Sequence, residues 1–400
     1  MGHRRRWGLL GLTVAAVLAV APTARAAASA DVPSFTAIAA GSGHTCGLTV
    51  AGDVLCWGDN SSGQLGDGTQ TTRLSPVPVL GLHVVSAIAA GGAHTCALAG
   101  DGVWCWGENA HGQLGDGTKV ASARPVRVAR SERFRALAVG FGHSCALDVR
   151  ASVFCWGYNG DGQLGSGNNT DSPRPVAVRG LHGATAITAG AQHTCAVLRT
   201  GTASCWGYNH HGELGNGGFT SATRPVAVVG LSGPVALVVA GGFHTCATTD
   251  AAGVQCWGFN RNYQLGHGTT AGNQSAAPLA VIGVDDHVVA IAANTLHSCV
   301  LTATDRKAYC WGINETGQLG TGTTDNMPTA VPVQHLAGGL RALAAGQFHT
   351  CAVDADGHAL CWGRNANGEL GDGTGVDSVT PVTVGGAAST TARRPTQSRA

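Results

Sequence analysis

Fourteen cysteines recur along the 400-residue chain as seven closely spaced pairs, and a histidine stands two residues before the first cysteine of each pair. In the first unit, His44, Cys46 and Cys56 could offer three ligands to zinc, while the two cysteines alone could form a disulfide. No fourth ligand recurs with the trio, so we expect disulfides, with zinc as the competing interpretation. The expected pairs are Cys46–Cys56, Cys96–Cys105, Cys145–Cys155, Cys195–Cys205, Cys246–Cys256, Cys299–Cys310 and Cys351–Cys361.

The repeated histidines invite a catalytic or metal-binding interpretation, but their repetition argues for a structural role. Equivalent atoms spread around a ring of units cannot meet at one metal ion. We therefore expect each histidine to begin a strand and to form a hydrogen bond within its own unit. The set is His44, His94, His143, His193, His244, His297 and His349.

Catalytic motifs are not found in the sequence. There is no Gly-x-Ser-x-Gly elbow, no His-Glu-x-x-His helix motif, and no cysteine left over as a nucleophile. The Gly-Gln-Leu-Gly runs lack the strand-then-helix setting of a phosphate-binding loop, and an Asn-led turn explains them better. The sequence thus predicts a protein that is not an enzyme and holds no metal or cofactor.

Seven copies of one unit, 49 to 54 residues apart, must position these residues. The first copy contains four short strand-like segments, at 35–41, 44–48, 54–57 and 76–79, separated by turn-rich stretches. With residues 50–52 as a hairpin loop, Cys46 faces Cys56 across the two central strands. Four strands repeated seven times predict an all-β, seven-bladed β-propeller with four antiparallel strands and one disulfide in each blade.

Residue size and proline indicate which strand is inner and which is outer. The first segment of each unit ends in small residues, such as Ala89-Ala90-Gly91, which suit the crowded axis of a propeller. The fourth segment usually opens with proline, at Pro125, Pro175, Pro225, Pro278 and Pro381. Proline cannot donate to a sheet ladder and belongs on an edge strand, so we expect the fourth strand to lie at the rim.

The ends of the chain differ from the repeats. Arg4–Arg6, the apolar run 7–20 and small residues near 24–30 are typical of a signal peptide, with a membrane anchor as the alternative. We expect a signal peptide at 1–30, the propeller at 31–385 and a disordered tail at 386–400. Paired cysteines after an export signal predict a secreted, extracellular protein with no membrane span after processing. The formal net charge of +1 argues against a nucleic-acid partner.

A resemblance to a known family rests on the runs Gly-x-x-His-Thr-Cys-Ala-Leu and Cys-Trp-Gly-x-Asn-x-x-Gly-Gln-Leu-Gly-x-Gly-Thr. The second unit carries them at 91–98 and 105–118. They resemble the repeat of the regulator of chromosome condensation family, whose secreted bacterial branch this chain is similar to. The resemblance covers 35–384 and implies a seven-bladed propeller. Members include a nucleotide exchange factor, photoreceptors, ligase-associated modules and secreted proteins that clasp other proteins. Export, the scarcity of lysine and the evenness of the repeats argue against nucleotide exchange here.

Function in a repeat protein is expected where the copies differ. The loops that join the first to the second strand and the third to the outer strand must share one face, and there blades three to five carry aromatic residues and an arginine. The predicted binding residues are Phe141, Tyr158, Tyr208, Phe243, Phe259, Arg261 and Tyr263. They indicate a monomeric, secreted scaffold that binds an extracellular or cell-surface protein. Inward packing of these rings, a cell-wall glycan partner and a catalytic site across blades are the alternatives.

Overall fold

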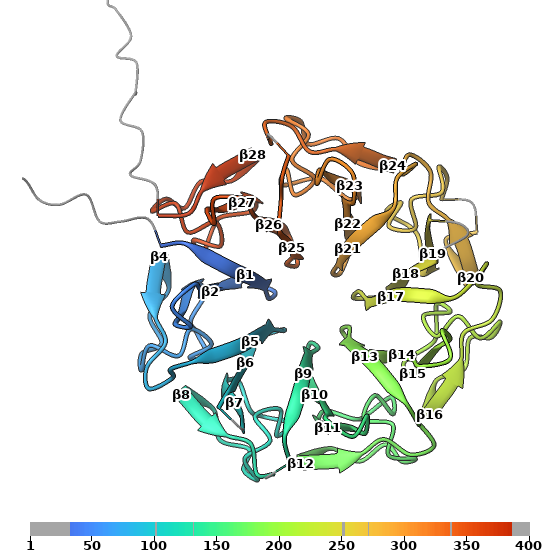
Figure 1. Ribbon diagram of the computed structural model, residues 1–400, viewed down its shortest axis with the longest axis horizontal. Helices are drawn as coiled ribbons and strands as arrows, with labels where there is room; N and C mark the ends of the chain where they lie inside the picture. Colours follow the sequence, from blue (N-terminus) through green and yellow to red (C-terminus); the bar gives the residue numbers. More distant parts are fainter. Residues whose placement is uncertain are drawn as a thin grey trace, which may run out of the picture. The chain divides into compact units, whose positions relative to one another are not determined.

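Seven four-stranded antiparallel sheets surround a central axis in the computed structural model (Figure 1). The structure describes residues 33–385 except 101, 131, 250–252, 271 and 337. Each sheet uses four strands that are consecutive in sequence, so the predicted seven-bladed propeller is confirmed. We number the blades 1 to 7 in chain order. The predicted signal peptide at 1–30 and the tail at 386–400 lie outside the described residues.

The inner two strands of every blade have simple sequence signatures. The innermost strands are short and rich in small residues: β1 (Phe35–Ala40), β5 (Val85–Ala90), β9 (Phe134–Val139), β13 (Ala184–Ala189), β17 (Val235–Ala240), β21 (Val288–Ala293) and β25 (Ala342–Ala345). The second strands begin at the repeated histidine: β2 (His44–Thr49), β6 (His94–Ala99), β10 (His143–Asp148), β14 (His193–Leu198), β18 (His244–Thr249), β22 (His297–Thr302) and β26 (His349–Val353).

The outer half of each blade contains the Cys-Trp-Gly strand and the rim strand. The third strands are β3 (Val54–Gly58), β7 (Gly102–Gly107), β11 (Val153–Gly157), β15 (Ala203–Gly207), β19 (Gly253–Phe259), β23 (Ala308–Gly312) and β27 (Ala359–Gly363). The rim strands are β4 (Arg73–Pro78), β8 (Ser122–Arg127), β12 (Ser172–Ala177), β16 (Ala222–Ala227), β20 (Gln274–Ala280), β24 (Met327–Pro332) and β28 (Ser378–Thr383).

All fourteen cysteines form the seven predicted disulfides. Each joins the second and third strands of one blade at directly paired positions, as Cys46 and Cys56 do in blade 1. The Cα–Cα separations are 4.0–4.1 Å throughout. The pairing of the second and third strands thus brings the two sulfurs together, and no free cysteine remains to bind zinc. Seven disulfides indicate an oxidising environment. Among the described residues, no helix has the length and apolar character needed to cross a membrane.

The rim strands begin earlier than the sequence predicted. We expected the first to start at Pro76, but β4 starts at Arg73. In β8, Val126 and Arg127 pair with the third strand, Ser122 pairs again, and the register shifts in between. Pro125 lies within that shift, where the ladder requires no N–H donor from it. The prolines therefore mark an irregularity inside an edge strand and not its first residue.

A ring of side-chain hydrogen bonds joins the blades, and it corrects our expectation for the histidines. Nε2 of His44 lies 2.8 Å from Oγ1 of Thr95 in the next blade, and the same contact recurs at all seven seams at 2.6–2.9 Å. The prediction of a bond within one blade was wrong, because each imidazole points across the seam toward the second strand of the next blade. Thr95 Oγ1 in turn donates to the Gln64 carbonyl, so the hydroxyl oxygen accepts from the histidine.

The Gly-Gln-Leu-Gly run completes each seam. Trp106 Nε1 of blade 2 donates to the Gln64 carbonyl of blade 1 at 2.9 Å, and Leu65 is fully buried. Gly66 has a φ of 70°, and a Cβ there would lie 2.8 Å from Trp106 Nε1. Glycine is therefore needed both for the backbone conformation and for the approach of the indole. The most repetitive part of the sequence is the part that joins one blade to the next.

The ring closes without a strand exchanged between the first and last blades. His349 Nε2 of blade 7 lies 2.8 Å from Thr45 Oγ1 of blade 1, and Trp57 Nε1 donates to the Glu369 carbonyl at 2.9 Å. Phe35 and Val384, from β1 and the end of blade 7, are both fully buried in one core cluster. The closing seam thus has the same chemistry as the other six.

Candidate binding surface

One face of the disc carries two sets of loops from every blade, which we call the loop face. The loop between the first and second strands is bonded to the residue after Cys-Trp-Gly: Asp59 N donates to Gly43 O, and Phe259 N donates to Phe243 O, both at 2.8 Å. The equivalent bond recurs in all seven blades at 2.8–3.1 Å. The prediction that both loops share one face is therefore confirmed. The remaining face, with the hairpins between second and third strands, is the reverse face.

Four rings form an aromatic cluster on the loop face at the seam between blades 4 and 5: Tyr208, His211, Phe243 and Phe259. The His211 ring lies 4.8 Å from Phe259 and about 6 Å from the other two, as ring centroids. Phe243 lies 6.3 Å from Tyr208 and 6.4 Å from Phe259, with the rings edge to face. Tyr208, Phe243 and Phe259 are half-buried. They pack against one another and also present ring surface to solvent, so both interpretations of these rings hold in part.

A second aromatic contact lies two seams back, between blades 2 and 3. His111 packs edge to face on Tyr158 with centroids 4.9 Å apart, and its Nδ1 lies 2.9 Å from Asp171 Oδ2. Burial raises the pKa of Tyr158, and the nearby carboxylates of Asp161 and Asp171 raise it further. Tyr158 is thus set in an acidic neighbourhood.

Glu213 lies beneath the aromatic cluster, at a position where five blades have glutamine. It is fully buried. Its Oε2 accepts from the His211 N–H at 2.9 Å, while its Oε1 has no hydrogen-bond partner. Burial raises its pKa to about 7, although backbone hydrogen bonds oppose that shift. Burial likewise raises the pKa of Tyr208, with Glu213 and Asp161 adding to the effect.

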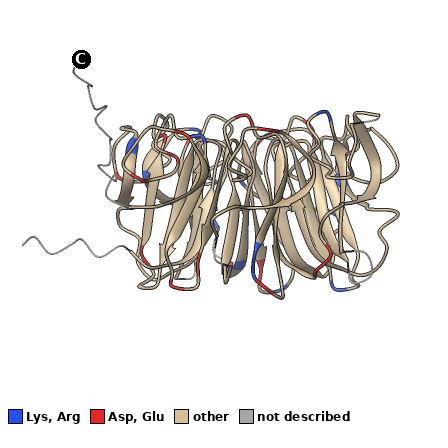
Figure 2. Ribbon diagram, turned by 90° about the horizontal axis from the view of Figure 1, so that it is seen from above, with Lys and Arg blue, Asp and Glu red and all other residues tan. Residues whose placement is uncertain are grey.

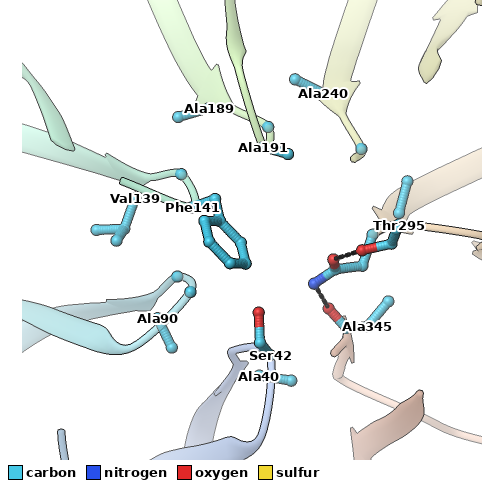
Figure 3. A pocket seen from close by; sticks show the side chains of 17 residues that line it. Ala40, Ser42, Ala90, Val139, Phe141, Ala189, Ala191, Ala240, Thr295 and Ala345 are labelled. Carbon is cyan, nitrogen blue, oxygen red and sulfur yellow. Dashed lines mark hydrogen bonds between the residues drawn. The ribbon is translucent and has the colours of Figure 1, made fainter. Parts of the chain in front are cut away.

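Phe141 lies apart from the aromatic cluster, at the axial mouth of the loop face (Figure 3). The mouth encloses about 110 Å³ and is lined mainly by glycine and alanine from all seven blades. The Phe141 ring points into it, opposite Ser42, and is 55% exposed. Phe141 stands two residues before its repeated histidine, whereas Phe243 stands directly before its own. This one-residue difference places Phe141 at the axial mouth and Phe243 in the aromatic cluster.

The last two predicted residues belong to the third-to-outer loop of blade 5. Arg261 is exposed and lies two residues after Phe259 of the aromatic cluster. Tyr263 replaces a glycine and has a φ of 62°. At the equivalent Gly317, a Cβ would lie 2.6 Å from Val379 Cα in the next blade. The Tyr263 side chain therefore starts toward the seam between blades 5 and 6, where the Ser298 Oγ–Gln264 O distance is 3.4 Å, against 2.8–3.0 Å at the other six seams.

The sequence prediction missed the histidines and the buried carboxylate of this surface. His210 lies 4.6 Å from Tyr208 as ring centroids, and Asp161, His211 and Glu213 complete the surroundings. A signal was present, because His211 and Glu213 differ from the residues at their positions in most other copies. Tyr208 was predicted because the copies differ at its position. The same criterion, applied along the whole loop, would have identified His211 and Glu213.

Among the residues that the structure describes, one group of side chains has the spacing of a metal site: Asp354, Asp356 and His358, in the hairpin between β26 and β27. Asp354 Oδ1 accepts from the backbone N–H of Asp356 and of His358, and Oδ2 lies 3.1 Å from His358 Nδ1. These bonds close the hairpin on itself and explain the cluster.

Comparison with known proteins identifies the family. The model of the RCC1-like domain matches residues 2–342, and that of the regulator of chromosome condensation (RCC1) repeat matches 341–369. The chain belongs to the RCC1-like family. Solved propellers of this family share its fold: yeast RCC1 (Prp20), determined bound to Kap60, has a TM-score of 0.75 and 22% identity over 84% of each chain. Human WBSCR16 has a TM-score of 0.73 and 22% identity over 83% of this chain and 93% of its own.

Curated relatives match over a shorter span. The ultraviolet-B receptor UVR8 of Arabidopsis thaliana is 32% identical over 144 residues, which is 35% of this chain and 32% of the receptor. The probable E3 ubiquitin-protein ligase HERC4 of Homo sapiens is 32% identical over 151 residues, 36% of this chain and 14% of the ligase. The chain thus spans about a third or less of these relatives, which diverge in their named activities.

Proposed function

We propose that this RCC1-like propeller is a secreted, non-catalytic scaffold that binds another protein through its loop face. The observation that carries the proposal is the aromatic cluster, which combines half-exposed rings from two blades on a rigid support. Aromatic side chains are favoured anchors in protein interfaces because they bury large area with few rotatable bonds.

Rigidity supports the same proposal. Each loop that presents a ring is bonded to its blade, and each blade contains a disulfide and hydrogen-bonded seams on both sides. A surface that is ordered before binding loses little conformational entropy on association. The fully paired cysteines leave no thiol nucleophile, which favours binding over catalysis.

The test combines capture with a matched pair of variants. Proteins of the extracellular fraction are captured on the immobilised propeller, identified, purified and measured for affinity. Replacement of Tyr208, Phe243 and Phe259 by alanine should weaken the interaction about a hundredfold, because central aromatic anchors each contribute about 1–2 kcal/mol or more. Replacement of Asp59, Ser62 and Glu108 by alanine, on the same face in blades 1 and 2, should change the affinity less than threefold. Equal affinity for both triple variants would contradict the proposal.

A further inference from the structure

The reverse face distributes its charges unevenly among the blades, although the formal net charge of the chain is only +1. Figure 2 shows the charged residues mainly in the loops at the two faces of the disc. In blades 2 to 4 the reverse face gathers seven arginines, which we call the arginine sector: Arg127, Arg130, Arg133, Arg135, Arg150, Arg179 and Arg199. In blades 5 to 7 the corresponding hairpins and connections carry five aspartates and three cations: Asp285, Asp286, Asp305, Asp354 and Asp356 with Arg306, Lys307 and Arg341. The excess of positive charge thus lies in blades 2 to 4, and a polyanion near this face would be drawn to that half.

Backbone contacts make the arginine sector continuous. Val149 N, beside Arg150, donates to the Arg133 carbonyl at 3.1 Å. The Arg135 guanidinium donates to the Ala184 carbonyl of blade 4 at 3.1 Å, and Arg199 N donates to Gly183 O next to it at 2.9 Å. Arg130 Nη1 of blade 2 lies 3.5 Å from the Pro175 carbonyl of blade 3. The segments that carry the arginines are therefore adjacent from blade 2 to blade 4, which suits a linear ligand.

The carboxylates described within this sector are already engaged. Glu132 pairs with Arg130 at 2.8 Å. Asp148 accepts from the backbone N–H groups of Arg150 and Ser152 at 2.8 and 2.7 Å. Six of the seven arginines, all except Arg130, are exposed. Guanidinium groups bind carboxylates and phosphates through paired hydrogen bonds, so an anionic ligand matches this surface.

A surface hollow and an indole narrow the class of anion. The hollow, about 370 Å³, is walled by residues 127–130, including Arg127 and Arg130. Trp104 is half-buried and pairs in register with Arg127, so the two side chains lie on the same side of blade 2. An aromatic face beside a guanidinium suits a sugar ring that carries an acid group. Single-stranded nucleic acid prefers a series of stacking rings, whereas Phe134 and Phe154 pack on each other, with Arg130 over Phe154.

We propose that the arginine sector binds an acidic polysaccharide, while the loop face remains available for the protein partner. The seven tryptophans of the Cys-Trp-Gly repeat are fully buried at the seams. Trp104, which is not part of the repeat, packs against the core between blades 1 and 2 and keeps part of its surface exposed near Arg127, where an acidic sugar would contact both residues. This second surface does not depend on the proposed function of the loop face.

The experiment measures binding of the purified protein to alginate, a linear polymer of uronic acids, with neutral dextran as the uncharged control. Wild-type protein should bind alginate and not dextran, with affinity falling as salt rises. Combined Arg127→Glu, Arg150→Glu and Arg199→Glu substitutions, one in each of blades 2 to 4, should weaken binding at least about tenfold at low salt.

The matched control reverses the same number of charges in the same blades. Arg124, Arg174 and Arg224 are exposed on β8, β12 and β16 near the loop face, and their replacement by glutamate should change alginate affinity less than twofold. Equal losses in both triple variants, absence of alginate binding, or tighter binding to a DNA duplex than to alginate would overturn the proposal. Capture of a protein partner by the loop face should be unchanged in the first variant, which separates the two proposals.

Discussion

The seams and the loop face of this propeller are adjacent but follow opposite rules. Every seam repeats one set of contacts, a histidine to a hydroxyl and an indole to a carbonyl, in all seven copies. Two residues after each repeated tryptophan, position 59 and its equivalents on the loop face carry side chains of which only the two tyrosines match: Asp59, Glu108, Tyr158, Tyr208, Phe259, Ile313 and Arg364. The difference teaches that stability and recognition are encoded by separate residues of the same loop. The predictions below test how complete that separation is.

Acid should break all seven seams together and have the largest effect. Burial lowers the pKa of each repeated histidine from its ordinary 6.5 to about 3 or 4. Between pH 6.5 and about 4 the unfolded chain therefore binds protons that the folded ring does not, and stability falls as pH falls. Each histidine contributes about 1.4 kcal/mol per pH unit in that window. Urea unfolding at pH 8, 7, 6 and 5 checks this, and equal stability at pH 8 and pH 5 would contradict it.

Two substitutions in blade 4, two residues apart, should separate the stability of the fold from partner binding. Trp206 is fully buried at the seam between blades 3 and 4, and Trp206→Ala should cost about 3–5 kcal/mol of unfolding free energy. Tyr208, two residues later and half-buried, should cost about 1 kcal/mol or less when changed to alanine, and should reduce partner affinity instead. Denaturant unfolding and affinity measurements on both variants provide the check. If Tyr208→Ala destabilised the protein as much as Trp206→Ala, the separation would be wrong.

The smallest effect is expected at Glu213, a seam position beneath the aromatic cluster that carries a carboxylate where five blades have glutamine. The raised pKa of Glu213, about 7, means that its buried carboxylate costs stability above pH 7 and not below pH 4.5. Glu213→Gln should therefore stabilise the protein by about 2–3 kcal/mol at pH 8 and by much less at pH 5. Glu369→Gln should gain less, because that carboxylate accepts from Asn367 N and Nδ2 and lies 3.9 Å from Arg364. Thermal or urea unfolding at both pH values compares the two variants.

The sequence allowed the blade count, the strand order within a blade and all disulfides to be predicted, because Cys46 and Cys56 are close in the chain and their register follows from one hairpin. The partner of His44 was not predictable in this way. Thr95 is 51 residues away, and only the rotation between blades brings it close. The binding surface was predicted as one patch, but Phe141 and Phe243 point to different places after a one-residue shift in a tight loop. The arginine sector was missed because a whole-chain net charge averages over the arginine-rich blades 2 to 4 and the more acidic blades 5 to 7.

The closing seam has a consequence for the order of the chain. Since blades 7 and 1 are joined by the same contacts as any other pair, nothing in the ring distinguishes first from last. A circularly permuted version that is cut within the connection between β16 and β17, with a short linker replacing the present break, should assemble the same seven seams. The seams thus fix the order of the blades around the ring but not which blade comes first. Any connection from a rim strand to the innermost strand of the next blade can serve as the cut.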